Sequence, residues 1–264
     1  MWLPWKTGRP SAADVARRLV ILKQVVAYAA LVPEIKLRNQ WSAGEQESFT
    51  SQAVERRDQF WQGMQQAGLW PQLTPAEREY AQQTPATLTP EQQINASWRM
   101  EAAQVLLWAL TLIPTLPAWG DLANNSRLQA VPSDDPLPFI QKAVLRPEAE
   151  IDRGRQIAEL WHWRSRTREL MARGEPLRPD VRMKAAGLLS YDDIVRFSAS
   201  KSFERGEIPA PLGGDFPVCG KAYRELTQEE WEDVRSISFE RHFAFNWLAG
   251  RAPRNQWDRT PTAT

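Results

Sequence analysis

The chain has 264 residues, of which 42% are hydrophobic and 25% charged, as is usual for a globular protein with a substantial core. Its 33 basic and 32 acidic residues leave a formal net charge of +1, which gives no electrostatic case for nucleic acid as a partner. The single cysteine, Cys219, excludes an intrachain disulfide and a multi-cysteine zinc site, and it fits a reducing compartment.

The first apolar run, residues 17–33, shares two features with a signal peptide: arginines at its start and a small-residue Ala-Tyr-Ala sequence within it. Lys23 and Gln24 interrupt this run, however, and it starts late for a signal peptide. Its larger apolar residues recur at helical spacing, which predicts an amphipathic core helix over residues 11–32. A later run, residues 105–113, is too short to cross a bilayer. We therefore expect no membrane association and a cytoplasmic location.

Several helix starts are marked by a capping box, in which a hydroxyl residue is followed three positions later by an acid or amide. The boxes are Thr74 with Glu77, Thr89 with Gln92, Thr227 with Glu230 and, more loosely, Ser11 with Asp14. Together with the apolar periodicity, they predict further helices at residues 45–67, 74–82, 89–113, 147–173, 190–203 and 227–250.

Strand signals are weak throughout, because no convincing run alternates between apolar and polar residues. The longest irregular stretch, residues 206–223, is rich in glycine and proline, and it could hold a short β-hairpin. The sequence therefore predicts a mostly α-helical fold, with one multi-helix globular domain over residues 1–264.

The chain is rich in tryptophan, with 13 residues scattered from Trp2 to Trp257. A tryptophan ring buries a large area, and its N–H usually finds a partner, so most of these side chains are expected in the core or at its rim. An exposed subset would instead indicate a binding face.

One hint of a metal site lies in the helix predicted at residues 147–173. Glu159 and His162 form a Glu-x-x-His pair that shares one face of this helix, as in di-iron bundles. A second such pair is missing, since Glu240 and His242 are two residues apart and about 200° apart around a helix. A packed or surface His162 is therefore the favoured interpretation, and we expect no metal and no cofactor.

The same helix carries a run of basic residues. They are Arg153, Arg155, Arg164, Arg166, Arg168 and Arg173. Because acidic residues interleave with them, a solvated helix face is the favoured interpretation. Nucleic-acid binding through these arginines stays as a third, less favoured possibility.

Two strongly apolar helices contain charged residues that need partners. Arg99 and Glu101 lie in the helix at 89–113, and the helix at 227–250 contains a polar group of Glu240, Arg241, His242 and Asn246. Buried charges must be paired, or they shift their pKa and become neutral. A network of Arg99 with Glu240, and Glu101 with Arg241, would satisfy all four charges. The group then acts as a structural polar cluster that fixes how the two helices dock.

An enzymatic alternative uses the same residues. His242 would act as a general base with Glu240 or Asp258 orienting it, and Arg241 would hold an anion. The sequence supplies no obvious nucleophile and no cofactor loop, so we assign no catalytic residue. The structural interpretation is favoured, because ion-pair networks also perturb pKa values.

Several segments resemble an uncharacterised, mainly bacterial family catalogued as domain of unknown function 4272. They are "LTPAERE", "WRMEAAQVLLWAL", "HW" at residues 162–163, "DFPVCGKAYREL", "ERHFAFNWL" and the closing "WDRTPTAT". The resemblance runs from about Ser11 to the end of the chain, and it implies a mostly helical fold with no established reaction, cofactor or catalytic residue. Similar proteins keep an acidic residue near the end, where this chain has Ala263. The positions similar to the family are Trp98, Arg99, Glu101, Trp108, His162, Trp163, Glu240, Arg241, His242, Asn246, Trp247, Trp257 and Asp258.

These observations favour a non-catalytic protein that works by binding another protein. A concrete form is an inhibitor, such as an immunity protein that neutralises a toxin or effector. Aromatic residues would serve as anchors at such an interface. The alternative is an enzyme of unknown reaction that uses the cluster on the last helix. The candidate site residues are Arg99, Glu101, Glu240, Arg241, His242 and Asn246, followed by Glu159, His162, Trp163, Trp257 and Asp258.

Overall fold

Helices begin where the capping boxes of the sequence place them. The computed structural model describes residues 8–31 and 40–263. In each predicted box the hydroxyl accepts a hydrogen bond from the backbone N–H three residues later, and the side chain at that position bonds back. Two further boxes, at Ser42 and Ser190, begin two other helices. The capped helices are α1 (Ala12–Ala29), α3 (Ala43–Gln66), α4 (Pro75–Gln82), α5 (Pro90–Ala109), α9 (Tyr191–Glu204) and α10 (Gln228–Leu248).

The remaining elements are shorter, apart from α7 (Glu148–Ala172). The predicted hairpin is confirmed as β1 (Pro217–Val218) paired antiparallel with β2 (Lys221–Ala222). Two short helices, α6 (Leu137–Gln141) and α8 (Val181–Ala185), were not predicted from the sequence. Residue 32, the predicted end of the first helix, lies outside the described residues. Short 3-10 helices complete the chain: η1 (Trp70–Gln72), η2 (Asn125–Ala130), η3 (Tyr223–Glu225), η4 (Pro253–Asn255) and η5 (Trp257–Arg259).

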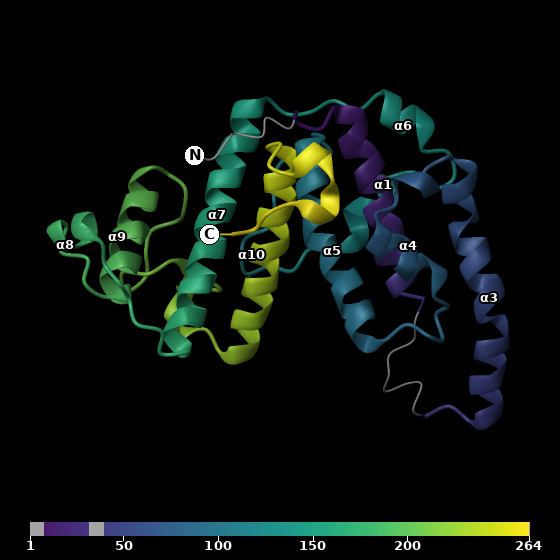
Figure 1. The fold of residues 1–264 in the computed structure, drawn as a ribbon, viewed down its shortest axis with the longest axis horizontal. Helices are drawn as coiled ribbons and strands as arrows, with labels where there is room; N and C mark the ends of the chain where they lie inside the picture. Colours follow the sequence, from purple (N-terminus) through teal and green to yellow (C-terminus); the bar gives the residue numbers. More distant parts are fainter. Residues whose placement is uncertain (1–7, 32–39, 264) are drawn as a thin grey trace.

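The long helices lie side by side, and α10 is at the centre of the arrangement. It packs against α7 on one side and α5 on the other, and α1 packs against α5 (Figure 1). The segment that follows α10 turns back and crosses it toward α7. The fold is therefore a single, mostly α-helical domain, as the sequence predicts, and the α5–α10–α7 layer is the frame for the site described below.

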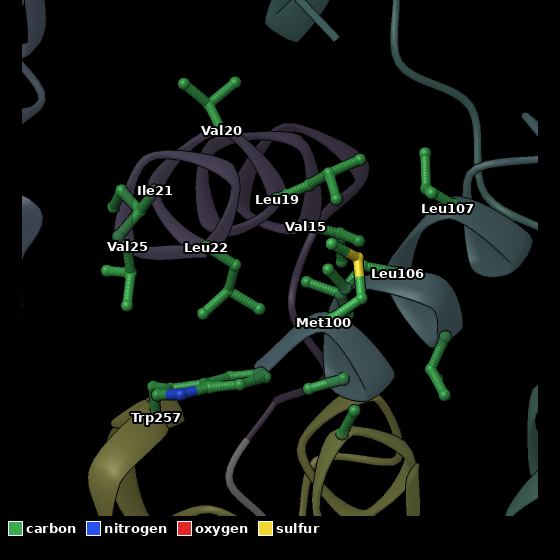
Figure 2. Packing of buried hydrophobic residues seen from close by; sticks show 14 of the residues in the cluster. Val15, Leu19, Val20, Ile21, Leu22, Val25, Met100, Leu106, Leu107 and Trp257 are labelled. Carbon is green, nitrogen blue, oxygen red and sulfur yellow. The ribbon is translucent and has the colours of Figure 1, made fainter. Parts of the chain in front are cut away.

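The main core is formed by buried residues of α1, α5 and α10, with α5 packed against both other helices. Val15, Leu19 and Leu22 of α1 are fully buried, which confirms the core helix predicted from their spacing. Figure 2 shows Leu22 and Val25 above the ring of Trp257, which comes from the far end of the chain. Within the described residues, no helix combines the length and the apolar character needed to cross a bilayer.

A second, smaller core lies between α7 and the loop that precedes α10. Trp161, Phe216 and Tyr223 fill it. Beside them Arg164 donates two hydrogen bonds of 2.7 Å to Asp215, and both side chains are at most 2% exposed. This buried ion pair fixes the loop around the hairpin to α7.

The tryptophans described by the structure all pack inside the molecule or at its rim. Trp61, Trp161, Trp247 and Trp257 are fully buried, and the other described tryptophans are partly buried. Trp2 and Trp5 lie outside the described residues. The packing prediction is confirmed for the described part of the chain, where no tryptophan stands fully exposed on the surface.

At Gly154, α7 leaves no room for a side chain beside the ring of Phe245 on α10. A Cβ atom at this position would lie 2.4 Å from Cε1 of Phe245. We expect Gly154→Ala to lower the free energy of unfolding by about 1–2 kcal/mol, because overpacking outweighs the gain in helix propensity. Urea denaturation measures this change. The matched control is Gly63→Ala in α3, where the nearest atom is 3.6 Å away. That variant should gain up to about 1 kcal/mol, and equal effects of the two substitutions would contradict the argument.

Candidate functional site

The two predicted ion pairs between α5 and α10 are both present. Nη1 of Arg99 donates to both carboxylate oxygens of Glu240, at 3.0 and 3.1 Å. Nε of Arg241 donates to Oε2 of Glu101 at 2.9 Å. The first pair lies at the edge of the helix interface, since the Arg99 side chain is 33% exposed, and the second is fully enclosed.

Arg241 also holds the loop that follows α5. Its guanidinium group donates to the backbone carbonyls of Pro117, Ala118 and Asp121, at 2.8–3.2 Å. The other oxygen of Glu101 accepts a hydrogen bond from the backbone N–H of Ala123 at 2.6 Å. One buried ion pair therefore fixes α5, α10 and this loop relative to one another.

None of the three adjacent polar residues of α10 is open to solvent. Glu240 is 6% exposed, Arg241 is not exposed, and His242 is 1% exposed. Burial raises the pKa of Glu240 above its ordinary value, although Arg99 opposes the shift. This sealed and paired geometry matches the structural interpretation of the cluster.

His242 belongs to a histidine pair that joins α10 to α7. Its Nδ1 lies 2.8 Å from Nδ1 of His162, and its Nε2 lies 2.9 Å from Nδ2 of Asn246. Both ring nitrogens are thus occupied, and neither Glu240 nor Asp258 orients the ring. The geometry assumed for His242 as a general base is therefore wrong, because Glu240 points to Arg99 and Asp258 is exposed beside Trp257 in a separate hollow.

Both histidines are held in their neutral form. Burial lowers the pKa of His242 to about 3, helped by His162 and by the charge of Arg155. Burial lowers the pKa of His162 to about 4, and the positive charges of Arg166 and Arg235 act in the same direction. His162 is 5% exposed, so of the two predicted alternatives, a packed or a surface histidine, the structure shows the packed one.

A cleft of about 760 Å³ opens next to this pair. Three segments besides α10 line it: α5 with Asn95, Trp98 and Arg99, α7 with His162 and Arg166, and the segment after α10 with Thr262 and Ala263. The residues from α10 are Arg235, Ser236, Phe239 and Glu240.

The electrostatic character of the cleft is positive. Three arginines line it, against one acid, Glu240, which is already bonded to Arg99. Arg166 is exposed and pairs with the buried carboxylate of Glu169, whereas Arg235 is exposed and forms no ion pair with any described residue. The exposed ring of Phe239 and the half-buried Trp98 provide apolar surface. Such a lining suits an anionic group with an apolar part.

The secondary candidates lie apart from this cleft, with the exception of His162. Glu159 pairs with Arg155 and, with Trp163, lines a different hollow facing α9. Glu159 and His162 thus line two different hollows of the surface. Across the described residues no group of three or more potential ligands is arranged to hold a metal ion. Trp257 packs against Phe243 and Trp247 in the core.

The basic run on α7 is only partly a solvated face. The prediction is wrong for Arg164, which is 2% exposed and paired with Asp215, and it is incomplete for Arg168, which donates to the carbonyls of Tyr223 and Leu226. These arginines turn inward because the loop before α10 offers them an acid and free carbonyl groups. The run is therefore not an open basic patch.

Sequence reasoning found the cluster but missed most of the cleft. Arg166, Arg235 and Phe239 were not singled out as site residues. A signal existed: Arg166 is one helical turn after His162, and Phe239 is one turn after Arg235, so each pair shares a helix face. Nothing in the sequence indicated that the two faces meet.

Comparison with known proteins adds one match. A family model described as "Domain of unknown function (DUF4272)" matches residues 7–186. The matched range contains Arg99, Glu101 and His162, and it ends before α10. No curated protein and no solved structure matches the chain.

Proposed function

The chain belongs to the DUF4272 family, and we propose that it is a non-catalytic protein that works by binding another protein. The sealed geometry of the α10 cluster supports this proposal, since Glu240, Arg241 and His242 are enclosed and bonded to other parts of the chain. A substrate would have no access to the cluster's buried imidazole. Binding must then use surfaces that remain open, and the cleft beside the cluster is one of them.

The single observation that carries the proposal is the charge of this cleft. Its arginines outnumber its acid, and Phe239 and Trp98 offer apolar contact beside them. Arginine and aromatic side chains are the residues that most often dominate binding energy at protein interfaces. We therefore propose that the cleft receives an acidic segment of a partner protein. Charge complementarity would steer this encounter and select the partner.

A protein that binds a partner without altering it can act as an inhibitor. We propose this role in the form of an immunity protein that neutralises a toxin or effector in the cytoplasm. The near-neutral net charge supports selective rather than general binding of charged partners. The free cysteine, Cys219, supports a reducing compartment.

Charge reversal in the cleft tests the proposed function. The chain would be co-expressed with the products of adjacent genes and recovered by affinity capture. We expect a stoichiometric partner for the wild-type chain, and binding at least about tenfold weaker for the double variant Arg166→Glu and Arg235→Glu.

The matched control reverses two charges elsewhere. Arg182 and Lys184 are exposed on α8, at the outer edge of the molecule (Figure 1). Their double replacement by glutamate changes the net charge equally and should leave capture unchanged. If the cleft variant retains the partner as well as this control does, the cleft is not the interface.

A further inference from the structure

A chain of hydrogen bonds connects the C-terminal segment to the wall of the cleft. Nδ2 of Asn246 donates to the carbonyl of Pro261 at 2.9 Å and lies 2.9 Å from Nε2 of His242. Nδ1 of His242 lies 2.8 Å from Nδ1 of His162, which lines the cleft. The last bond crosses from α10 to α7, so the chain links three segments.

The direction of these bonds follows from the chemistry of the groups. The carbonyl of Pro261 can only accept, so the amide group that faces it, and that also faces His242, is the NH₂ group of Asn246. Nε2 of His242 therefore accepts, and its neutral ring carries the proton on Nδ1. That N–H donates to Nδ1 of His162, which leaves the proton of the second neutral ring on Nε2.

Nε2 of His162 is the free end of this chain. The Nδ1 edge of the ring is turned to His242, and no described residue forms a hydrogen bond with Nε2. Since His162 lines the cleft, the Nε2 edge remains to face it. Because the hydrogen bonds run from Asn246 through His242 to His162, Nε2 of His162 presents an N–H donor to the cleft and no lone pair.

We propose that the cleft binds a carboxylate group through the Nε2–H of His162 and the arginines around it, and that Asn246 and His242 hold this N–H in place as positioning residues. This inference rests on the proposed function, because it names the chemistry by which the cleft would take an acidic segment. His162 is the specificity-determining residue, and its neighbours act through it.

The donors of the cleft suit a carboxylate in particular. Arginine presents a planar fork that matches the two oxygens of a carboxylate. Two carboxylates of the chain itself already bond to arginines of the cleft, Glu240 to Arg99 and Glu169 to Arg166. Arg235 has no such partner among the described residues and is exposed on the rim. It would pair with the incoming group, while His162 donates the neutral hydrogen bond.

The first test reads the tautomer directly. The chain has two histidines, so a ¹⁵N spectrum of the imidazole nitrogens contains only His162 and His242. We expect the proton on Nε2 of His162 and on Nδ1 of His242 in the wild-type chain at pH 7. A proton on Nδ1 of His162 would overturn the proposal without any variant having to be made.

Two isosteric variants then test the positioning role. In His242→Asn, the amide Nδ2 takes the place of the ring Nδ1 and can still donate to His162; in His242→Leu, no donor remains. Both variants leave His162 as the one imidazole in the spectrum. We expect the Nε2–H form in the asparagine variant and a mixture of tautomers in the leucine variant. The Nε2–H form alone in both variants would rule out the positioning role.

The ligand class is tested with a hexaglutamate peptide, succinate and inorganic phosphate. The peptide and succinate should perturb the His162 signal of the wild-type chain and the asparagine variant, and the leucine variant should bind them about tenfold more weakly. Binding of phosphate without either carboxylate probe would overturn the choice of ligand. Binding of succinate alone would assign the site to a free carboxylate metabolite.

Failure of the inference and failure of the proposed function leave different results. If charge reversal in the cleft does not weaken partner capture, the proposed function fails, whatever the tautomer. If capture depends on the cleft arginines but His162 carries its proton on Nδ1, the proposed function stands and the inference about His162 fails.

Discussion

Replacing Arg241 with methionine is expected to lower the free energy of unfolding by about 3–5 kcal/mol, because Glu101 then remains as a buried carboxylate without its partner. The loss also includes the hydrogen bonds to the carbonyls of Pro117, Ala118 and Asp121. Urea denaturation at pH 7 measures the change. Arg99→Met should lower the free energy of unfolding clearly less, since Arg99 is one-third exposed and water screens its pair with Glu240.

A double-mutant cycle separates the buried charge from the lost packing. In Arg241→Met combined with Glu101→Met, neither charge remains in the interface, so the double variant should be at least about 1 kcal/mol more stable than the sum of the single effects predicts. Additive losses would mean that the two side chains act independently. The ion pair of Arg241 and Glu101 would then not be what fixes α5 against α10.

The helix starts could be predicted because their signals are local. In a capping box, the residues that bond to each other are three positions apart, as Thr74 and Glu77 are. The partners of Arg99 and Arg241 could be predicted for a different reason: each of two apolar helices carried one acid and one base, and burial requires that charges be paired. The pairing could therefore be inferred from the need to neutralise buried charges, without knowing how far apart the residues lie.

Other features follow only from tertiary structure. His162 and His242 are 80 residues apart, and two neutral imidazoles give no charge complementarity from which to infer a pair. The buried state of Arg164 depends on Asp215, an acid in an irregular loop with no periodic signal. α6 and α8 have five residues each, which is too few for helical periodicity to stand out. The cleft requires three helices and the C-terminal segment to meet.

The neutral histidine pair predicts a strong dependence of stability on pH. In the unfolded chain both histidines titrate near pH 6.5, but in the folded chain burial holds their pKa values at about 4 and about 3. The unfolded state therefore binds protons first as the pH falls. Above about pH 7 both histidines are neutral in either state, and the free energy of unfolding is at its full value. Between pH 7 and pH 5, protonation of each histidine in the unfolded state should lower the free energy of unfolding by about 2 kcal/mol. Denaturation curves across this window measure the total.

His162→Gln isolates the contribution of one histidine of the pair. Arg166 and Arg235 lower the pKa of His162 and Glu169 raises it, while Arg155 acts on His242. The raised pKa of Glu240 works in the opposite direction, since the folded state gains that proton more readily. This carboxyl and the other acids remain in the variant, so their effects cancel in the comparison. The loss between pH 7 and pH 5 should fall by about half. If the free energy of unfolding falls with pH equally in both proteins, His162 is not held neutral in the folded state. The inferred direction of the hydrogen bonds between Asn246, His242 and His162 would then be wrong, because it requires neutral rings.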